Sequence, residues 1–212
     1  MIYNMSMDKI FSYIIPRKEK VILGFKVFYG LILVTVFAAS RSLYFGDNNA
    51  LFFYNLGVNS GRAALVFYVM TLVPGIAERF GIRHKLLALL RIFRRYLGIT
   101  MYLLALNHSL SVKFIITLAS KQIIPLRLFE VLGFGALSIL FFLFITSNDL
   151  SLGRLGIWWY RIHRLTYLSM GLIFLHVALQ RFSIWSVIMG ITVALQISSF
   201  AYKYFVKIQS SI

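Results

Sequence analysis

Long apolar runs alternate with short polar or basic segments along the chain. An α-helix needs roughly 20 apolar residues to cross the hydrocarbon core of a bilayer, where every backbone polar group must be satisfied internally. Runs of this kind lie near residues 21-40, 60-77, 96-112, 130-147, 163-180 and 184-202. The pattern therefore predicts an all-α fold, a six-helix transmembrane bundle.

Two connecting segments mix apolar and polar residues. The segment RSLYFGDNNALFFYNLGVNSGR, between the first two runs, combines turn residues with aromatic residues, which is typical of a loop at the membrane surface. The segment SVKFIITLASKQIIPLRLFE, after the third run, is apolar enough to rival a helix, but Lys121 and Pro125 favour a short surface-lying piece. We therefore expect a loop in each place.

Composition excludes several classes of protein. The 212 residues are 60% hydrophobic and 17% aromatic, more than a soluble domain of this size can keep off its surface. Lys and Arg number 22 against 6 Asp and Glu, which in a membrane protein is typical of basic cytoplasmic loops and not of nucleic-acid binding. The chain has no cysteine, so thiolate ligands and iron–sulfur clusters are excluded, and any redox chemistry needs a bound cofactor.

The basic residues also predict the orientation of the bundle. If both termini are cytoplasmic, that side receives most of the Lys and Arg, and the outer side keeps only Arg41, Arg62, Lys113, Lys121, Arg127 and Arg181. This bias follows the positive-inside rule. We expect a retained cytoplasmic N-terminal segment at 1-20 with no signal-peptide cleavage site, a transmembrane domain at 21-203 and a cytoplasmic tail at 204-212.

Two of the four histidines fall in apolar runs at a similar depth. His108 lies near the outer end of the third run, and His176 lies near the outer end of the fifth. An intramembrane ionisable side chain is costly unless it faces the bundle interior and finds a partner. Neutral imidazoles from two facing helices make a six-coordinate haem site suited to electron transfer. We therefore predict a haem between His108 and His176; the alternative is that each imidazole only hydrogen-bonds a neighbour.

His163 is a third candidate. It precedes His176 by 13 residues, about 20 Å along a helix, and the two rings would differ by roughly 140° in azimuth. Either the fifth helix is distorted, for example at Gly171, or His163 serves another site. A second bis-histidine site would need a histidine where Arg94 and Arg95 stand, so the sequence supports one haem and leaves a second open.

Cationic side chains near the membrane edges are candidates for anionic groups. Arg62, at the start of the second run, suits the propionates of haem b, and it equally suits an ordinary interface anchor. The inner arginines are open to propionates, to the phosphate of FMN or to lipid headgroups, of which lipid is favoured: Arg94, Arg95, Arg161 and Arg164.

Two other features receive simpler expectations. Gly98 and Gly171 would allow a helix backbone or a porphyrin to approach closely. His84, in the basic segment FGIRHKLL, is expected to be solvated.

Four stretches together carry a family resemblance. They are GRAALVFYVMTL, RRYLGITMYLLALNH, TSNDLSLGRLGIWWYRIHRLTYL and the later FLH, and their most specific part runs from Thr146 to Tyr167. These residues resemble the ferric reductase-like transmembrane superfamily. The stand-alone form without a dehydrogenase domain is similar to the YedZ/MsrQ family, the haem-binding membrane subunit of a periplasmic methionine sulfoxide reductase system.

The resemblance implies a b-type cytochrome of the bacterial inner membrane. Electrons would come from a cytoplasmic flavin reductase or a quinone and pass to an extracytoplasmic reductase subunit that contains molybdenum. The family's haem-ligand positions fall on His108 and His176, with His163 as an additional inner histidine, and the family's usual spacing favours a distorted fifth helix.

Two other functions remain as hypotheses. One is a self-sufficient reductase that acts directly on outer ferric iron, copper or oxygen, although we expect no flavin-binding domain within the chain. The other is a non-redox transporter or scaffold with structural histidines, but the apolar runs lack the paired acids and broken segments typical of transport sites.

Overall fold

The chain folds into a bundle of long helices. A computed structural model describes residues 9–121 and 125–209, and all regular structure in these residues is helical, which confirms the all-α fold. Six helical stretches are long and apolar enough to cross a membrane: Lys9–Phe45, Ala50–Arg79, Arg94–Ser120, Leu128–Ile145, Ile157–Gln180 and Ile184–Val206. The architecture is therefore that of a multi-pass membrane protein.

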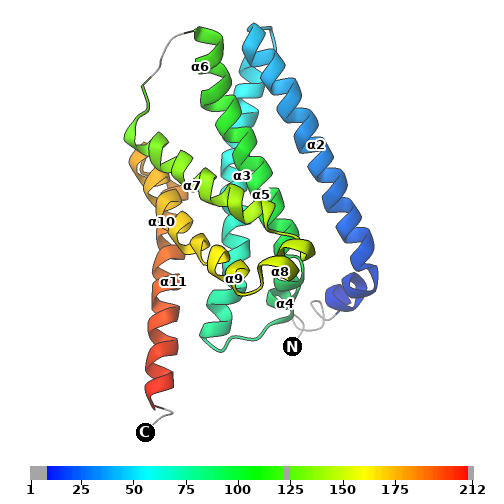
Figure 1. Ribbon diagram of the computed structural model, residues 1–212, viewed down its shortest axis with the longest axis vertical. Coiled ribbons are helices and arrows are strands. Elements are labelled where there is room, and N and C mark those ends of the chain that lie inside the picture. The colour runs from blue at the N-terminus through cyan, green and yellow to red at the C-terminus, as the bar shows by residue number, and fades with distance from the viewer. Residues whose placement is uncertain (1–8, 122–124, 210–212) are drawn as a thin grey trace.

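Shorter elements divide some of these stretches (Figure 1). Their order is η1 (Ile15–Arg17), α2 (Lys18–Phe45), α3 (Ala50–Arg79), α4 (Lys85–Ile92), α5 (Arg94–Ser109), η2 (Leu110–Phe114), α6 (Ile115–Ser120), α7 (Leu128–Ile145), α8 (Asp149–Leu155), α9 (Ile157–His163), α10 (Leu165–Gln180) and α11 (Ile184–Gln209). Both described ends of the chain lie toward one end of the bundle, the lower end in Figure 1. We call this the terminal end and the opposite one the far end.

The expectation of a surface loop at 41-62 is wrong, because most of these residues are helical. Helix α2 continues to Phe45 and α3 begins at Ala50, so the turn is only four residues long. Gly46 ends α2 with φ 66°, a conformation that glycine adopts without strain. Asp47 then accepts hydrogen bonds from the hydroxyl of Ser42 and from the backbone N–H of Asn49. These contacts close the turn, and the remaining apolar and aromatic residues stay helical.

The expectation of a short surface-lying piece at 111-130 is also wrong for the first half of that segment. Directly after α5 the backbone takes a π-helical turn at Leu110–Phe114 and continues as α6 to Ser120. The third span therefore extends to the far end, where Lys121 stops it with φ 53°. Residues 122–124 of this segment lie outside the described residues.

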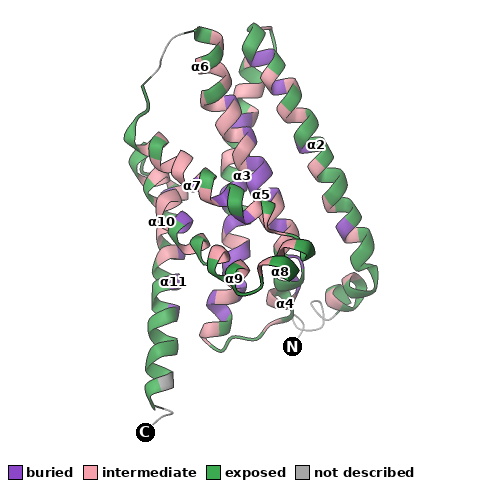
Figure 2. Cartoon of the chain, in the orientation of Figure 1, coloured by how far each residue is buried: buried purple, intermediate pink, exposed green. Residues whose placement is uncertain are grey.

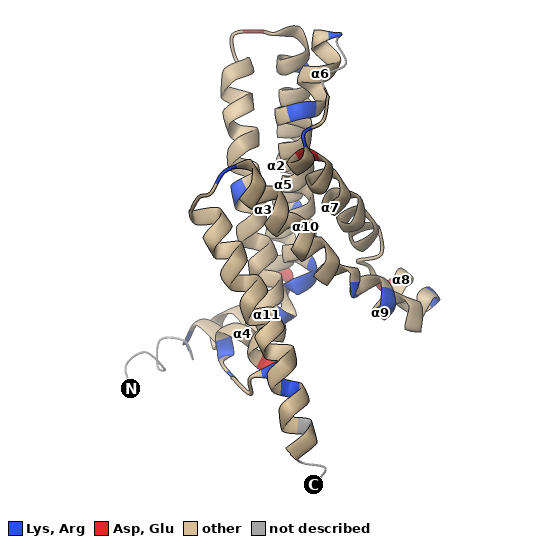
Figure 3. Cartoon of the chain, turned by 90° about the vertical axis from the view of Figure 1, so that its left-hand side faces the viewer, with Lys and Arg blue, Asp and Glu red and all other residues tan. Residues whose placement is uncertain are grey.

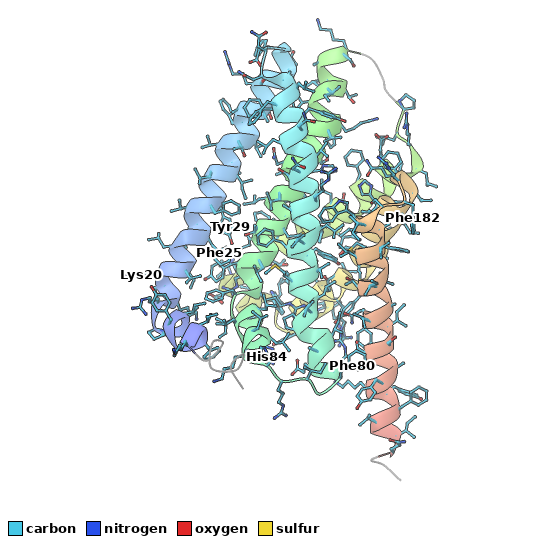
Figure 4. All side chains as sticks on the ribbon, turned by 180° about the vertical axis from the view of Figure 1, so that it is seen from behind. Lys20, Phe25, Tyr29, Phe80, His84 and Phe182 are labelled. Atoms are coloured by element: carbon cyan, nitrogen blue, oxygen red, sulfur yellow. The ribbon has the colours of Figure 1, made fainter. Side chains whose placement is uncertain are left out.

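The core lies between α3 and α5 and extends to α7, α10 and α11. The most extensive helix contacts join α3 to α5 and α7 to α10, and buried residues concentrate on α3 and α5 (Figure 2). Helix α2 packs on α5 through a small aromatic group in which Phe25 stacks on Tyr96 and the hydroxyl of Tyr29 donates to the Tyr96 carbonyl (Figure 4). The other faces of α2 and much of α11 expose large apolar side chains, as lipid-facing surfaces do.

Charge is distributed unevenly between the two ends. Lys and Arg gather toward the terminal end, around α4, α8, α9 and the last turns of α11 (Figure 3). This agrees with the bias seen in the sequence. The positive-inside rule would place the terminal end in the cytoplasm.

Candidate cofactor site

A cavity of about 700 Å³ separates the α3–α5 pair from the α7–α10 pair. Cofactor sites commonly occupy roughly 300–1,000 Å³ and are mostly apolar with a few placed polar groups. Apolar side chains from all four helices line this cavity: Leu65, Met101, Leu137, Leu140 and Ile173. The volume and lining suit a large and mostly apolar ligand.

His108 and His176 face one another in this cavity. Their ring centroids are 6.5 Å apart and the ring planes are 75° apart. A metal held between two imidazole nitrogens at about 2 Å each, with each nitrogen about 1 Å from its ring centre, gives a centroid separation of roughly 6 Å. The two rings are therefore spaced to bind one metal ion between them.

Hydrogen bonds to backbone carbonyls set the tautomer of both rings. Nδ1 of His108 lies 3.0 Å from the carbonyl oxygen of Gly57, and Nδ1 of His176 lies 2.6 Å from that of Phe129. Because a carbonyl oxygen can only accept, each Nδ1 carries the hydrogen and donates it. Nε2 of each ring is then left with a free lone pair, the form in which imidazole binds metals.

The residues present fit haem better than a bare metal ion. In the described part of the chain no three His, Asp or Glu side chains come together as a ligand set. Two facing imidazoles therefore suit a metal that brings its own equatorial ligands, as haem iron does. The apolar cavity around the two rings provides space for a porphyrin.

Charged side chains line the far end of the cavity, next to the α10–α11 connection. Arg62 is one of them, as the sequence predicts, and its guanidinium donates to Oδ1 of Asn59 at 3.0 Å. Lys113 and Glu130 form an ion pair at 3.0 Å, and Arg181 also lines the cavity. The last three were missed as site residues, because only the fold brings Lys113 of η2, the start of α7 and the end of α10 together beside Arg62 of α3.

Tyr68 closes the cavity toward the terminal end. It is only 1% exposed, and its hydroxyl donates to the carbonyl of Thr166 at 2.6 Å and lies 3.0 Å from Oγ of Ser169. These contacts join α3 to α10 beneath the two histidines. The hydroxyl is satisfied there, as a buried phenol requires.

His163 lies apart from the cavity. Its ring stacks on Trp159 with centroids 3.9 Å apart, and its Nε2 is 3.2 Å from Oγ1 of Thr146. The fifth span is interrupted, as expected, but at Arg164, directly after His163, while α10 runs unbroken through Gly171. The structure thus brings His108, His176 and Arg62 to one cavity and does not bring His163 there; its role in binding a cofactor stays a prediction.

The glycines that permit close approach are not the expected ones. A Cβ atom placed on Gly98 or Gly171 would meet no atom within 4 Å, so neither position brings two helices together. The close approaches in the cavity occur at Gly61 and Gly133, where the two histidine rings lie against the backbone. Nothing in the residue pattern distinguishes these two glycines from the others.

His84 and two of the inner arginines, Arg95 and Arg161, have local partners at the terminal end. His84 is the N-cap of α4, where its Nδ1 accepts from the backbone N–H of Leu86 at 3.2 Å. Arg95 pairs with Asp149, and the guanidinium of Arg161 lies 4.6 Å from the ring centroid of Trp158. Whether these arginines also hold lipid headgroups or FMN stays a prediction.

Comparison with protein-family models, with curated proteins and with solved structures finds no match to this chain.

Proposed function

We propose that the protein is a b-type cytochrome of the membrane that carries electrons between its two sides. The observation that carries this proposal is the His108–His176 pair, whose facing rings are 6.5 Å apart and are both held as Nδ1–H tautomers. Two imidazoles so arranged could together hold one haem iron. Haem b bound there would supply a one-electron redox centre within an apolar cavity.

The chain's own residues would define how that centre behaves. His108 and His176 would both hold the iron through Nε2, and a haem held by two imidazoles would supply electron transfer. Leu65, Leu137 and Leu140 would exclude water from the site. The haem propionates would find cations at the far end of the cavity, from Arg62, Arg181 and Lys113.

The direction of electron flow and the partners are proposed from the resemblance and from the charge pattern. The donor would be a cytoplasmic flavin or NAD(P)H enzyme, or a quinone, at the basic terminal end. The acceptor would be an extracytoplasmic reductase subunit at the far end, in a system that reduces methionine sulfoxide. The exposed Arg62 and Arg181 support this placing of the acceptor, because there the cavity lining reaches the surface.

A visible spectrum of the detergent-purified protein tests the proposal. The reduced-minus-oxidised difference is expected to show a low-spin b-type signal, with about one haem per chain at the His108–His176 site. His108→Ala and His176→Ala should each abolish this signal, and His84→Ala should keep it, because His84 only caps α4. A colourless protein from haem-replete cells, or normal spectra in both alanine variants, would refute the proposal.

Reoxidation kinetics test the nature of the acceptor. The reduced protein would be mixed with ferric citrate, and separately with a purified methionine sulfoxide reductase subunit and its oxidised substrate. We expect fast reoxidation only with the reductase subunit. Fast reoxidation by ferric citrate alone would instead indicate a self-sufficient metal reductase.

A further inference from the structure

Both cavity histidines are seated in the same kind of notch on a neighbouring helix. On α3, His108 donates to the carbonyl of Gly57 and its ring lies against Gly61. On α7, His176 donates to the carbonyl of Phe129 and its ring lies against Gly133. In each case the acceptor carbonyl is followed four residues later by glycine. We call these two arrangements the α3 notch and the α7 notch.

Helix geometry explains the four-residue spacing. In an α-helix the carbonyl of one residue accepts from the N–H four residues later, so a ring that shares this carbonyl must lie beside that later residue. A Cβ atom on Gly61 would be 2.7 Å from Nδ1 and 2.8 Å from Cγ of His108. A Cβ atom on Gly133 would be 2.7 Å from Nδ1 and 2.9 Å from Cε1 of His176. Any larger residue at either position must therefore displace the ring.

The clash with a histidine ring is confined to the two notch glycines; Gly57, also on α3, has no room for a Cβ atom either, but there the atoms in the way belong to Ser111. Other glycines on the same helices have room for a methyl group: on α3, Gly75 would meet only Arg79 side-chain atoms at 3.7 Å or more, and on α7, Gly135 would meet Leu172 at 3.7 Å. These are ordinary van der Waals distances. Close packing of α3 on η2 accounts for Gly57, whereas at Gly61 and Gly133 the nearest atoms are those of the histidine rings.

We infer that Gly61 and Gly133 are positioning residues, which seat the two imidazoles on backbone carbonyls so that both Nε2 atoms face one metal ion. This inference rests on the proposed function for its effect on haem, while the seating of the rings stands on the contacts alone. Loss of a hydrogen bond that orients a ligating histidine typically weakens metal binding by about 10- to 100-fold. Alanine at either notch is expected to act at that scale.

The experiment compares Gly61→Ala and Gly133→Ala with Gly75→Ala and Gly135→Ala, the controls on the same helices. Each notch variant is expected to bind haem about 10- to 100-fold more weakly, or to shift toward a five-coordinate form that binds carbon monoxide when reduced. The control variants should keep the wild-type spectrum and should not bind carbon monoxide. Wild-type haem affinity and spectra in both notch variants would overturn the inference.

A measurement without haem separates this inference from the proposed function. Histidine-selective ¹⁵N NMR distinguishes Nδ1–H from Nε2–H imidazoles, and in the haem-free protein His108 and His176 are expected to be Nδ1–H. Gly61→Ala should perturb only the His108 signals and Gly133→Ala only those of His176. If the wild type binds no haem but these shifts occur, the proposed function fails and the notches stand; if neither variant shifts its histidine, the notches fail.

A double variant covers the case in which a notch variant does not fold. Because the clash is with the imidazole ring, Gly61→Ala combined with His108→Ala should fold as well as His108→Ala alone. The same holds for Gly133→Ala with His176→Ala. If truncating the ring does not restore folding, the damage comes from elsewhere and the inference is wrong.

Discussion

The imidazole of His163 lies flat against the indole of Trp159, with centroids 3.9 Å and planes 23° apart. Both rings are tied to the last turn of α7. The indole N–H of Trp159 donates to the Thr146 carbonyl at 2.9 Å, and Nε2 of His163 is 3.2 Å from the Thr146 hydroxyl. This cluster joins α9 to α7 at a place that does not line the cavity. It therefore has a structural role that needs no cofactor.

His163→Ala is accordingly expected to keep the haem signal of the His108–His176 site. It should lower the free energy of unfolding by about 1–2 kcal/mol, because it removes an aromatic stack and a hydrogen bond. Visible spectra and unfolding in mixed detergent micelles measure the two effects. Trp159→Leu removes the same stack from the other side and also the indole hydrogen bond to the Thr146 carbonyl, so it should lower the free energy of unfolding at least as much as His163→Ala.

Loss of the main b-type signal in His163→Ala would contradict this prediction. Loss of a separate, second spectral component would show instead that His163 binds another haem, the possibility that the sequence leaves open.

Arg62→Gln is expected to lower the midpoint potential of the bound haem and to leave its axial ligation unchanged. A cation near the haem stabilises its reduced form relative to its oxidised form. Arg62 lines the cavity, and its guanidinium donates to Asn59 and not to either histidine. A spectroelectrochemical titration measures the shift. Arg41→Gln is the control, because Arg41 is also a cation near the far end but does not line the cavity. It should shift the midpoint potential less than Arg62→Gln does. Equal shifts would argue against a specific role for Arg62.

Glu130→Gln tests the ion pair at the far end of the cavity. The Lys113 and Glu130 side chains are only 18% and 17% exposed, and Glu130 also accepts from the backbone N–H of Arg127 at the start of α7. Removing one charge of a partly buried pair should cost about 1–3 kcal/mol, more than an exposed pair provides. Glutamine keeps an acceptor for the Arg127 N–H, so Glu130→Ala should be less stable still, by about 1 kcal/mol.

A double-mutant cycle with Lys113→Met identifies the pair itself. The double variant should be less destabilised than the sum of the two single variants, because neither charge is then left alone. Strict additivity would show that the two side chains do not stabilise one another.

The number of spans and the similar depth of His108 and His176 could be predicted from the sequence, but His108 lies near the middle of the third span, Arg94–Ser120, and not near its outer end. Apolar run length indicates that a membrane helix is present, although the first three spans extend well beyond the predicted runs, and a histidine within such a run is conspicuous. The first connection could not be predicted in the same way. Asn59 and Ser60 read as turn residues, yet Ser60 is buried and accepts from Nδ2 of Asn107 at 2.8 Å. Polar residues that pair between helices look the same in a sequence as those of a loop.

The α3 and α7 notches could not be predicted from the sequence for a different reason. Hydropathy gives the position of a residue along the membrane normal but not which helix it faces. The acceptors of His108 and His176 are backbone carbonyls of Gly57 and Phe129, and a carbonyl leaves no mark in the sequence. The helix pairing had to be known before Gly61 could be distinguished from Gly98.

Asp149 provides a prediction with a defined dependence on pH. The hydrogen bond from Arg95, 3.0 Å between Nη1 and Oδ2, holds the pKa of this carboxyl below its usual value of about 3.9. The folded protein therefore binds this proton less tightly than the unfolded chain does, and the pair stabilises the fold at pH values above about 4. That contribution is lost as the pH falls through the lowered pKa. Asp149→Asn should thus unfold at a slightly lower temperature than wild type at pH 7, and the gap should close in acid.

The dependence on salt concentration should distinguish the charged Arg95–Asp149 pair from a carboxylate whose main hydrogen-bond partners are uncharged. Asp149 is 85% exposed, so added salt should screen its attraction to Arg95 and shrink the gap at pH 7. The pKa of Asp47 is also lowered, first by the hydroxyl of Ser42 and then by the N–H of Asn49, which carry no charge, and the charge of Arg41 contributes least. The loss of thermal stability in Asp47→Ala should therefore change little with salt. If the Asp149→Asn gap widened in acid or ignored salt, the Arg95 pair would not be its cause.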